Sequence, residues 1–148
     1  MIRFRDAEEA DLPAIIALLA DDALGATREN PADLAPYRNA LRAIAAYGGR
    51  IVLAVDGDEV LGCLQLDLIP NLSLIATTRA QVEGVRVVPH RRGEGIGAAL
   101  MHEAIRLARD GGAGVVQLTT NLRRRDVQRF YARLGFAASH AGMKLALG

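Results

Sequence analysis

Cysteine and aromatic residues are scarce in this sequence. The single cysteine, Cys63, excludes an internal disulfide. There is no tryptophan, and Phe, Trp and Tyr together make up 4% of the chain, so stacking platforms for single-stranded nucleic acid are not expected. No apolar run is long enough to span a bilayer, and the first residues, MIRFRD, lack the apolar core of a signal peptide. We therefore expect a cytoplasmic protein without a membrane partner.

An excess of either charge is also lacking. The 18 Lys and Arg residues nearly balance the 17 Asp and Glu residues. This balance argues against a chain whose main role is to coat nucleic acid. Apolar residues, by contrast, are abundant, at 51% of 148 residues. That is enough for one ordinary globular core, and we expect a single domain over residues 1–148.

Hydrophobic periodicity predicts an α/β fold. Alternating apolar residues indicate strands, apolar residues three or four apart indicate helices, and turn signals such as Asp56-Gly57-Asp58 separate them. Strands joined by hairpins should be antiparallel, and strands joined through a helix should be parallel, which gives a mixed sheet. The predicted strands are 2–5, 50–55, 60–69, 77–88, 115–119, 136–140 and 143–147; the predicted helices follow Asp11 and Asp33 or span 95–109 and 126–134.

Residues 85–100 (VRVVPHRRGEGIGAAL) predict a phosphate-binding turn. They read as a buried strand, a basic turn with three glycines and the start of an apolar helix. Glycine lets backbone N–H groups approach an anion, and the helix N-terminus adds the positive end of its dipole. Arg91 and Arg92 lie beside the turn, either to contact phosphate or as solvated charges.

Three classes of ligand compete for this turn. The pattern G-x-x-x-x-G-K-[ST] is absent, which excludes a nucleoside triphosphatase of that type. Residues 93–98 (GEGIGA) fit the loose dinucleotide pattern G-x-G-x-x-A, but the next predicted strand, 115–119, is not followed by the acidic residue that such a site requires. The third pattern is [RQ]-x-x-G-x-G, here residues 92–97 (RGEGIG).

With this last pattern the chain resembles the GCN5-related N-acetyltransferase (GNAT) family. A second block, residues 129–136 (RFYARLGF), is similar to the family's F-Y-x-x-x-G-F segment, and the predicted order of elements matches along the whole chain. The resemblance implies a GNAT-like mixed, mostly antiparallel central sheet flanked by about four helices, with two strands splayed apart to hold coenzyme A. It also implies an N-acetyltransferase with acetyl coenzyme A as co-substrate, and a homodimer.

The resemblance assigns the coenzyme to the turn and the strand before it. Pyrophosphate is expected on backbone N–H groups of the turn, and the pantetheine arm alongside the strand. Gly84 suits a bulge that begins the splay, or is a packing glycine. The family's usual Asn position holds Arg124, so Asn121 is the candidate to reach the pantetheine. The expected coenzyme-binding residues are Val85, Val87, Arg92, Gly93, Gly95, Ile96, Gly97, Ala98 and Asn121.

Acetyl transfer to an amine requires two proton transfers. An amine of pKa ~10.4 is mostly protonated at pH 7, and freeing it costs about 4–5 kcal/mol, so a base is needed. By resemblance Glu83 is the candidate base; a structural ion pair or hydrogen bond is the alternative, and a water chain can replace it. Period two places Glu83 on the face of Val85 and Val87 unless a bulge intervenes. Tyr131 matches the family tyrosine near the coenzyme sulfur and is the candidate general acid; a core aromatic is the alternative.

Two other kinds of chemistry find no support. Cys63 lies in an apolar strand and is interpreted as core, because direct transfer needs no cysteine nucleophile. His90, His102 and His140 lack metal-ligand spacing, so no metal site is expected. The consecutive arginines 123–125 either meet the coenzyme 3′-phosphate or form a solvated start to the next helix.

The acceptor is expected between the loop 21–31, the second helix and the last hairpin around 140–144. The acidic residues Asp21, Asp22 and Glu29 suit an amine, and Arg28 suits a carboxylate. A small-molecule amine is expected, with a protein amine as the alternative. A non-catalytic acyl-coenzyme A sensor or partner-binding module on the same fold remains the alternative function.

Overall fold

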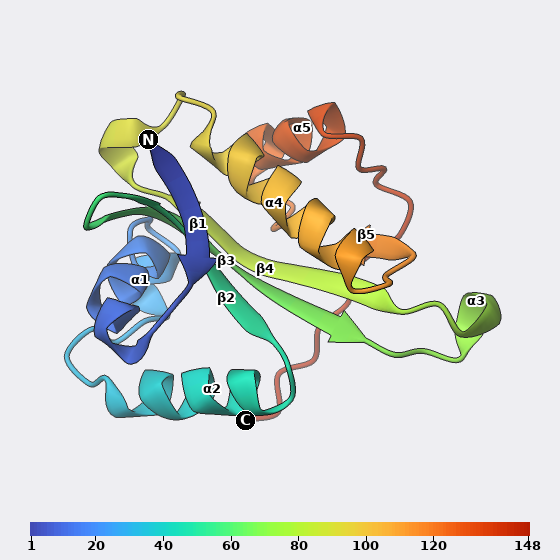
Figure 1. The fold of residues 1–148 in the computed structure, drawn as a ribbon, viewed down its shortest axis with the longest axis horizontal. Coiled ribbons are helices and arrows are strands. Elements are labelled where there is room, and N and C mark those ends of the chain that lie inside the picture. The colour runs from blue at the N-terminus through green and yellow to red at the C-terminus, as the bar shows by residue number, and fades with distance from the viewer. The chain divides into compact units, whose positions relative to one another are not determined.

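A five-stranded sheet with helices on both faces organises the N-terminal part of the chain (Figure 1). The computed structural model describes residues 1–148, which form two compact units, Met1–Gln117 and Leu118–Gly148. The strands are β1 (Ile2–Asp6), β2 (Arg50–Asp56), β3 (Glu59–Ile69), β4 (Arg79–Val87) and β5 (Val115–Gln117), and the helices are α1 (Leu12–Leu19), α2 (Ala35–Ala46), α3 (Ser73–Ala76), α4 (Ile96–Asp110) and α5 (Arg125–Arg133).

The sheet has the strand order β1-β2-β3-β4-β5. The pairs from β1 to β4 are antiparallel, and β4 pairs with β5 in parallel. The tight turn at Gly57, with φ of 58°, closes the β2–β3 hairpin, whereas α4 carries the chain from β4 across to β5. The predicted mixed, mostly antiparallel sheet is confirmed. The helix beyond the predicted four is α3, a single turn between β3 and β4.

The two faces of the sheet are covered by different helices. A Cβ on Gly62 would meet the side chain of Leu100 at 2.8 Å, so α4 packs on the face to which Gly62 belongs. The next residue, Cys63, forms a buried cluster with Ile15 and Leu18 of α1. Because successive strand residues point to opposite faces, α1 and α4 lie on opposite sides of the sheet. We call them the α1 face and the α4 face.

Both ends of α2 follow the predicted signals, whereas Asp11, at the start of α1, makes no side-chain capping hydrogen bond to that helix. The side chain of Asp33 accepts a hydrogen bond from the N–H of Ala35 at 3.1 Å, which satisfies a free donor at the start of α2. Gly48, with φ of 89°, allows the turn that follows α2. No helix of the structure has the length and apolar character needed to cross a bilayer.

The predicted C-terminal hairpin is wrong. Residues 136–140 and 143–147 form no strand, and α5 is the one regular element of the unit Leu118–Gly148. The alternation behind the prediction exists, but its apolar members Met143, Leu145 and Leu147 are 93%, 84% and 95% exposed. A strand also needs a neighbouring backbone for its N–H and C=O groups, which side-chain alternation does not supply.

Candidate active site

The glycine-rich turn between β4 and α4 presents a row of backbone donors. Gly93 and Gly95 have φ of 82° and 83°, a left-handed conformation that glycine adopts without strain. None of the N–H groups of residues 93–98 donates a backbone hydrogen bond, and the last three belong to the first turn of α4. Consecutive free N–H groups at a helix N-terminus suit a phosphate or pyrophosphate.

Both arginines beside the turn form ion pairs. Nε of Arg91 lies 3.0 Å from both carboxylate oxygens of Glu94. Nη2 of Arg92 donates to Asp21 at 2.8 Å, which joins the turn to the loop that follows α1. The predicted contact of Arg92 with the coenzyme stays a prediction, and any such contact has to compete with Asp21.

The strands β4 and β5 separate beside this turn. Their pairing covers only Arg79 to Gln81 on β4 and Val115 to Gln117 on β5. From Val82 to Val87, the edge of β4 that faces away from β3 has no strand partner. This is the expected splay, and it leaves the backbone at Val85 and Val87 open to an added strand-like ligand.

A bulge in β4 changes the orientation of the candidate base. Glu83 pairs with Gln65 and Arg86 pairs with Cys63, so Gly84 and Val85 together stand opposite one residue of β3. Gly84 has φ of 62°, as such a bulge favours. The predicted bulge is confirmed, and the uninterrupted period-two placement is wrong. Because Gln65 and Cys63 are two residues apart, Glu83 and Arg86 both project from the α1 face.

Glu83 is not held by other side chains. Its side chain is exposed and forms neither an ion pair nor a hydrogen bond. The structural ion pair considered as an alternative is therefore absent. The side chain of Leu19 packs against the bulge, because a Cβ on Gly84 would lie 3.5 Å from it. Glu83 thus stands near the end of α1, where the predicted acceptor loop begins.

A row of polar side chains next to Glu83 on the α1 face was not anticipated. The buried carboxylate of Asp67 accepts hydrogen bonds from the Tyr47 hydroxyl at 3.0 Å and the Gln65 amide at 2.9 Å. The hydrogen bond to Asp67 raises the pKa of Tyr47. Polar residues at alternate positions inside the long strands β3 and β4 were the available signal, but only the sheet register brings them together.

Cys63 belongs to the core, as interpreted. It is 2% exposed, and burial raises the pKa of its thiol to about 12. A thiol with that pKa is protonated at neutral pH and is a poor nucleophile. Its Sγ instead donates to the Gly84 carbonyl at 3.6 Å, in the bulge.

In the C-terminal unit, Tyr131 lies in an aromatic cluster. Its ring centroid is 5.1 Å from that of Phe130 and 5.7 Å from that of Phe136, both edge-on. Tyr131 is 9% exposed and is the one buried apolar residue of this unit. This packing is what a core aromatic requires, and it is also compatible with a catalytic hydroxyl. The general-acid role stays a prediction.

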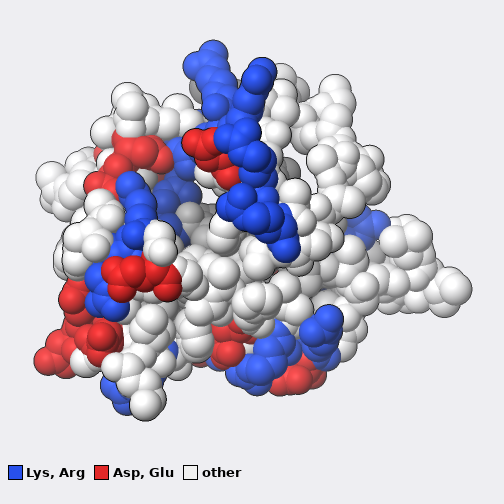
Figure 2. All heavy atoms as spheres, turned by 90° about the horizontal axis from the view of Figure 1, so that it is seen from above, with Lys and Arg blue, Asp and Glu red and all other residues white.

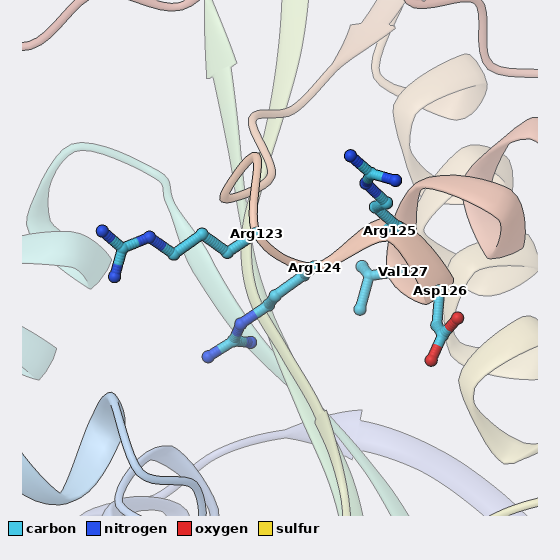
Figure 3. Close-up of a pocket in the computed structure, with 5 residues that line it drawn as sticks. All are labelled: Arg123, Arg124, Arg125, Asp126 and Val127. Carbon is cyan, nitrogen blue, oxygen red and sulfur yellow. The ribbon is translucent and has the colours of Figure 1, made fainter.

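Three arginines line a shallow pocket at the start of α5 (Figure 3). Arg123 and Arg124 extend to one side of the backbone and Arg125 to the other, with Asp126 and Val127 completing the lining. Such a pocket suits an anion, including the 3′-phosphate considered from the sequence. The side chain of Asn121 accepts a hydrogen bond from the N–H of Arg123 at 2.9 Å, so its carbonyl oxygen shapes this turn.

Charges of both signs occur side by side on one face of the molecule. Figure 2 shows basic and acidic side chains next to one another across one face, in keeping with the balanced composition. No group of three or more His, Cys, Asp or Glu side chains could hold a metal ion.

Comparison with known proteins agrees with this geometry. Residues 12–136 match the Acetyltransferase (GNAT) family. An aminoalkylphosphonate N-acetyltransferase from Salmonella typhimurium is 37% identical over 95 residues, which are 64% of this chain and 61% of that relative. The crystal structure of a transcriptional regulator from Bacillus halodurans superposes with a TM-score of 0.94 at 38% identity, over 99% of this chain and 100% of that one. An acetyltransferase from Trypanosoma brucei superposes with a TM-score of 0.83 at 25% identity, over 99% and 100%.

The chain therefore belongs to the GNAT family. Members of this family use acetyl coenzyme A, and the free N–H groups of the turn together with the splayed strands fit that co-substrate. The family predicted from the two sequence blocks is confirmed.

Proposed function

We propose that this protein, acting as one domain over residues 1–148 in the cytoplasm, transfers the acetyl group of acetyl coenzyme A directly to a primary amine of a small molecule. The observation that carries the proposal is the exposed, unpaired carboxylate of Glu83 on the strand that leads into the free N–H groups of residues 93–98. A donor site and a candidate base thus share one strand-turn-helix segment.

The coenzyme is held by backbone more than by side chains. Its pyrophosphate accepts hydrogen bonds from the N–H groups of residues 93–98, and its pantetheine arm adds to the unpaired edge of β4 at Val85 and Val87. Arg92 and Asn121 supply further contacts. Acetyl coenzyme A provides the acetyl group as a thioester: a bond forms from the acceptor nitrogen to the carbonyl carbon, and the C–S bond breaks.

Glu83 and Tyr131 move the protons of this reaction. Glu83 takes a proton from the acceptor ammonium, directly or through water, so that the nitrogen can attack. Tyr131 gives the proton of its phenol to the departing thiolate, and the proton that the nitrogen loses as the amide forms restores the phenol.

Aminoalkylphosphonates are the first acceptors to examine. The relative from Salmonella typhimurium carries that substrate class in its name, although the match spans 61% of its length. An amine of a protein is the alternative acceptor. The family resemblance also implies a homodimer. Light scattering of the purified protein would test this expectation.

Thiol release from acetyl coenzyme A, measured against a panel of amines and peptides, tests the proposal. We expect release with small amines, and a kcat/KM about 100-fold lower for Glu83→Gln at pH 7. The defect should shrink as the pH approaches the amine pKa of ~10.4, because the amine then needs no base. Coenzyme binding without release on any amine would instead identify a non-catalytic sensor.

A further inference from the structure

Glu83 and Arg86 place opposite charges side by side on the α1 face. In a regular strand, residues three apart point to opposite faces, but the bulge at Gly84 returns both side chains to the same face. Their partners on β3, Gln65 and Cys63, are two residues apart, or roughly 7 Å along the strand. The two charges nevertheless form no ion pair with each other.

The guanidinium of Arg86 lacks an acidic partner. Nη1 donates to the Val85 carbonyl at 3.0 Å, and Nε is buried without any acceptor. Arginine has five N–H donors in a planar fork that matches carboxylate and phosphate groups. Nε is closed to a ligand, but Nη2 is neither buried nor hydrogen-bonded, so an anion can reach the guanidinium there.

The other carboxylate on this face is already engaged. Asp67 is buried and accepts hydrogen bonds from both Tyr47 and Gln65, and it forms no ion pair with Arg86. On β3 and β4, Glu83 is therefore the carboxylate without a partner, and Arg86 is the nearby cation without an acidic one.

We propose that Glu83 and Arg86 together recognise a zwitterionic acceptor, in which a primary amine and a phosphonate or carboxylate are joined by a short spacer. The inference rests on the proposed acetyl transfer and names its substrate class. Glu83 receives the ammonium group, and Arg86 binds the acid group and so determines specificity. The shared chemistry is an anion with two or more oxygens, and the two acids are distinguished by experiment.

Arg79 provides a matched control. It lies on β4, is half-buried, and its Nε is also buried without an acceptor. It stands opposite Ile69, four residues before Glu83, and donates to the Ser73 hydroxyl at 2.9 Å. Loss of a half-buried arginine from β4 is thus common to both variants, whereas proximity to Glu83 is not.

The test compares kcat/KM for 2-aminoethylphosphonate, β-alanine and propylamine in the wild type, Arg86→Gln and Arg79→Gln. We expect the wild type to prefer at least one zwitterion to propylamine. Arg86→Gln should lower that preference about 10- to 100-fold, as loss of a charge-assisted hydrogen bond does. Arg79→Gln should retain the preference. The ratio of the two zwitterions shows whether phosphonate or carboxylate is recognised.

Equal loss of preference in both variants, or a wild type that prefers propylamine, would overturn the inference. A binding measurement separates it from the proposed function: thermal unfolding with coenzyme A and each zwitterion. If no amine releases thiol but 2-aminoethylphosphonate or β-alanine stabilises the wild type and not Arg86→Gln, the inference stands and the transferase proposal fails. If propylamine is acetylated and no zwitterion stabilises the wild type, the transferase proposal stands and the inference fails.

Discussion

The two units of this chain differ in how they are held together. Met1–Gln117 contains a five-stranded sheet with nearly all the buried apolar residues, including Ile16, Leu53, Leu61 and Leu100 at 0% exposure. Leu118–Gly148 contains one helix and a single buried apolar residue, Tyr131. The candidate base and the coenzyme turn therefore lie in or next to a well-packed sheet. The candidate acid, in contrast, lies in a segment with little core of its own.

Replacing Tyr131 should produce the largest change in activity. Tyr131→Phe keeps the ring in its cluster with Phe130 and Phe136 but removes the hydroxyl. We expect kcat to fall about 100-fold or more, because the thiolate loses its proton donor. Phe130→Leu, which disturbs the packing and keeps the hydroxyl, should affect kcat less. An unchanged kcat in Tyr131→Phe would leave this unit a packing role alone.

Truncating one leucine from each unit should show that the two units differ in their contribution to stability. Leu53→Ala removes a side chain of 0% exposure from β2 and should lower the free energy of unfolding by about 2–5 kcal/mol. Leu122→Ala, at a position that is 86% exposed, should change it by less than about 0.5 kcal/mol. Urea denaturation measures both. Comparable losses would show that the C-terminal unit is as tightly packed as the sheet.

A substitution in the coenzyme turn should have an intermediate effect. Gly95→Ala places a Cβ on a residue with φ of 83°, which costs about 1–2 kcal/mol and favours a turn whose N–H groups point elsewhere. We expect the Kd for acetyl coenzyme A to rise about tenfold. Gly57→Ala, with φ of 58° in the β2–β3 turn, carries similar strain. An equal rise in Kd in Gly57→Ala would show that lost stability, and not the geometry of the coenzyme turn, weakens binding.

The smallest effect should be the pH dependence of an ion pair. Both carboxylate oxygens of Asp11 accept hydrogen bonds from Arg5, at 2.8 and 2.9 Å, and these bonds hold the pKa of Asp11 below its usual range. A lowered folded-state pKa stabilises the protein above about pH 4, and this contribution is lost as the pH falls further. Asp11→Asn should flatten the acid side of the stability profile, measured by urea midpoints between pH 6 and 2.5.

Asp126 offers the comparison from the other unit. It pairs with Arg129 one helical turn away, and its side chain is 91% exposed. Water screens such a pair, so Asp126→Asn should leave the acid side of the profile nearly unchanged. A larger change in acid stability from Asp126→Asn than from Asp11→Asn would contradict the expectation that the ion pair of the first unit contributes more.

Local signals predicted most of the fold and the donor half of the site. The caps and glycines that end α2, the hairpin at Gly57 and the turn with Gly93 and Gly95 depend on neighbouring residues, which a sequence displays directly. The C-terminal strands failed because alternation reports which side chains share a face and says nothing of which backbone pairs with them.

The arrangement of side chains on the acceptor side could for the most part not be predicted from the sequence. Glu83 and Arg86 are three positions apart, so period two assigns them to opposite faces, and only the register with β3 reveals that they share one. The hydrogen bonds that occupy Asp67 come from Tyr47, which is 20 residues away, and from Gln65. Contacts of that kind depend on how strands and helices meet.

Residue types at short, regular spacing were enough to predict the family, the five strands and α1, α2, α4 and α5 in their order, and the turn that suits a phosphate. Only the tertiary structure decided which charges near Glu83 are already paired, which face they occupy and where β4 and β5 separate. Those features depend on the register between strands and on one bulge, and a shift of one residue in a strand moves every following side chain to the other face.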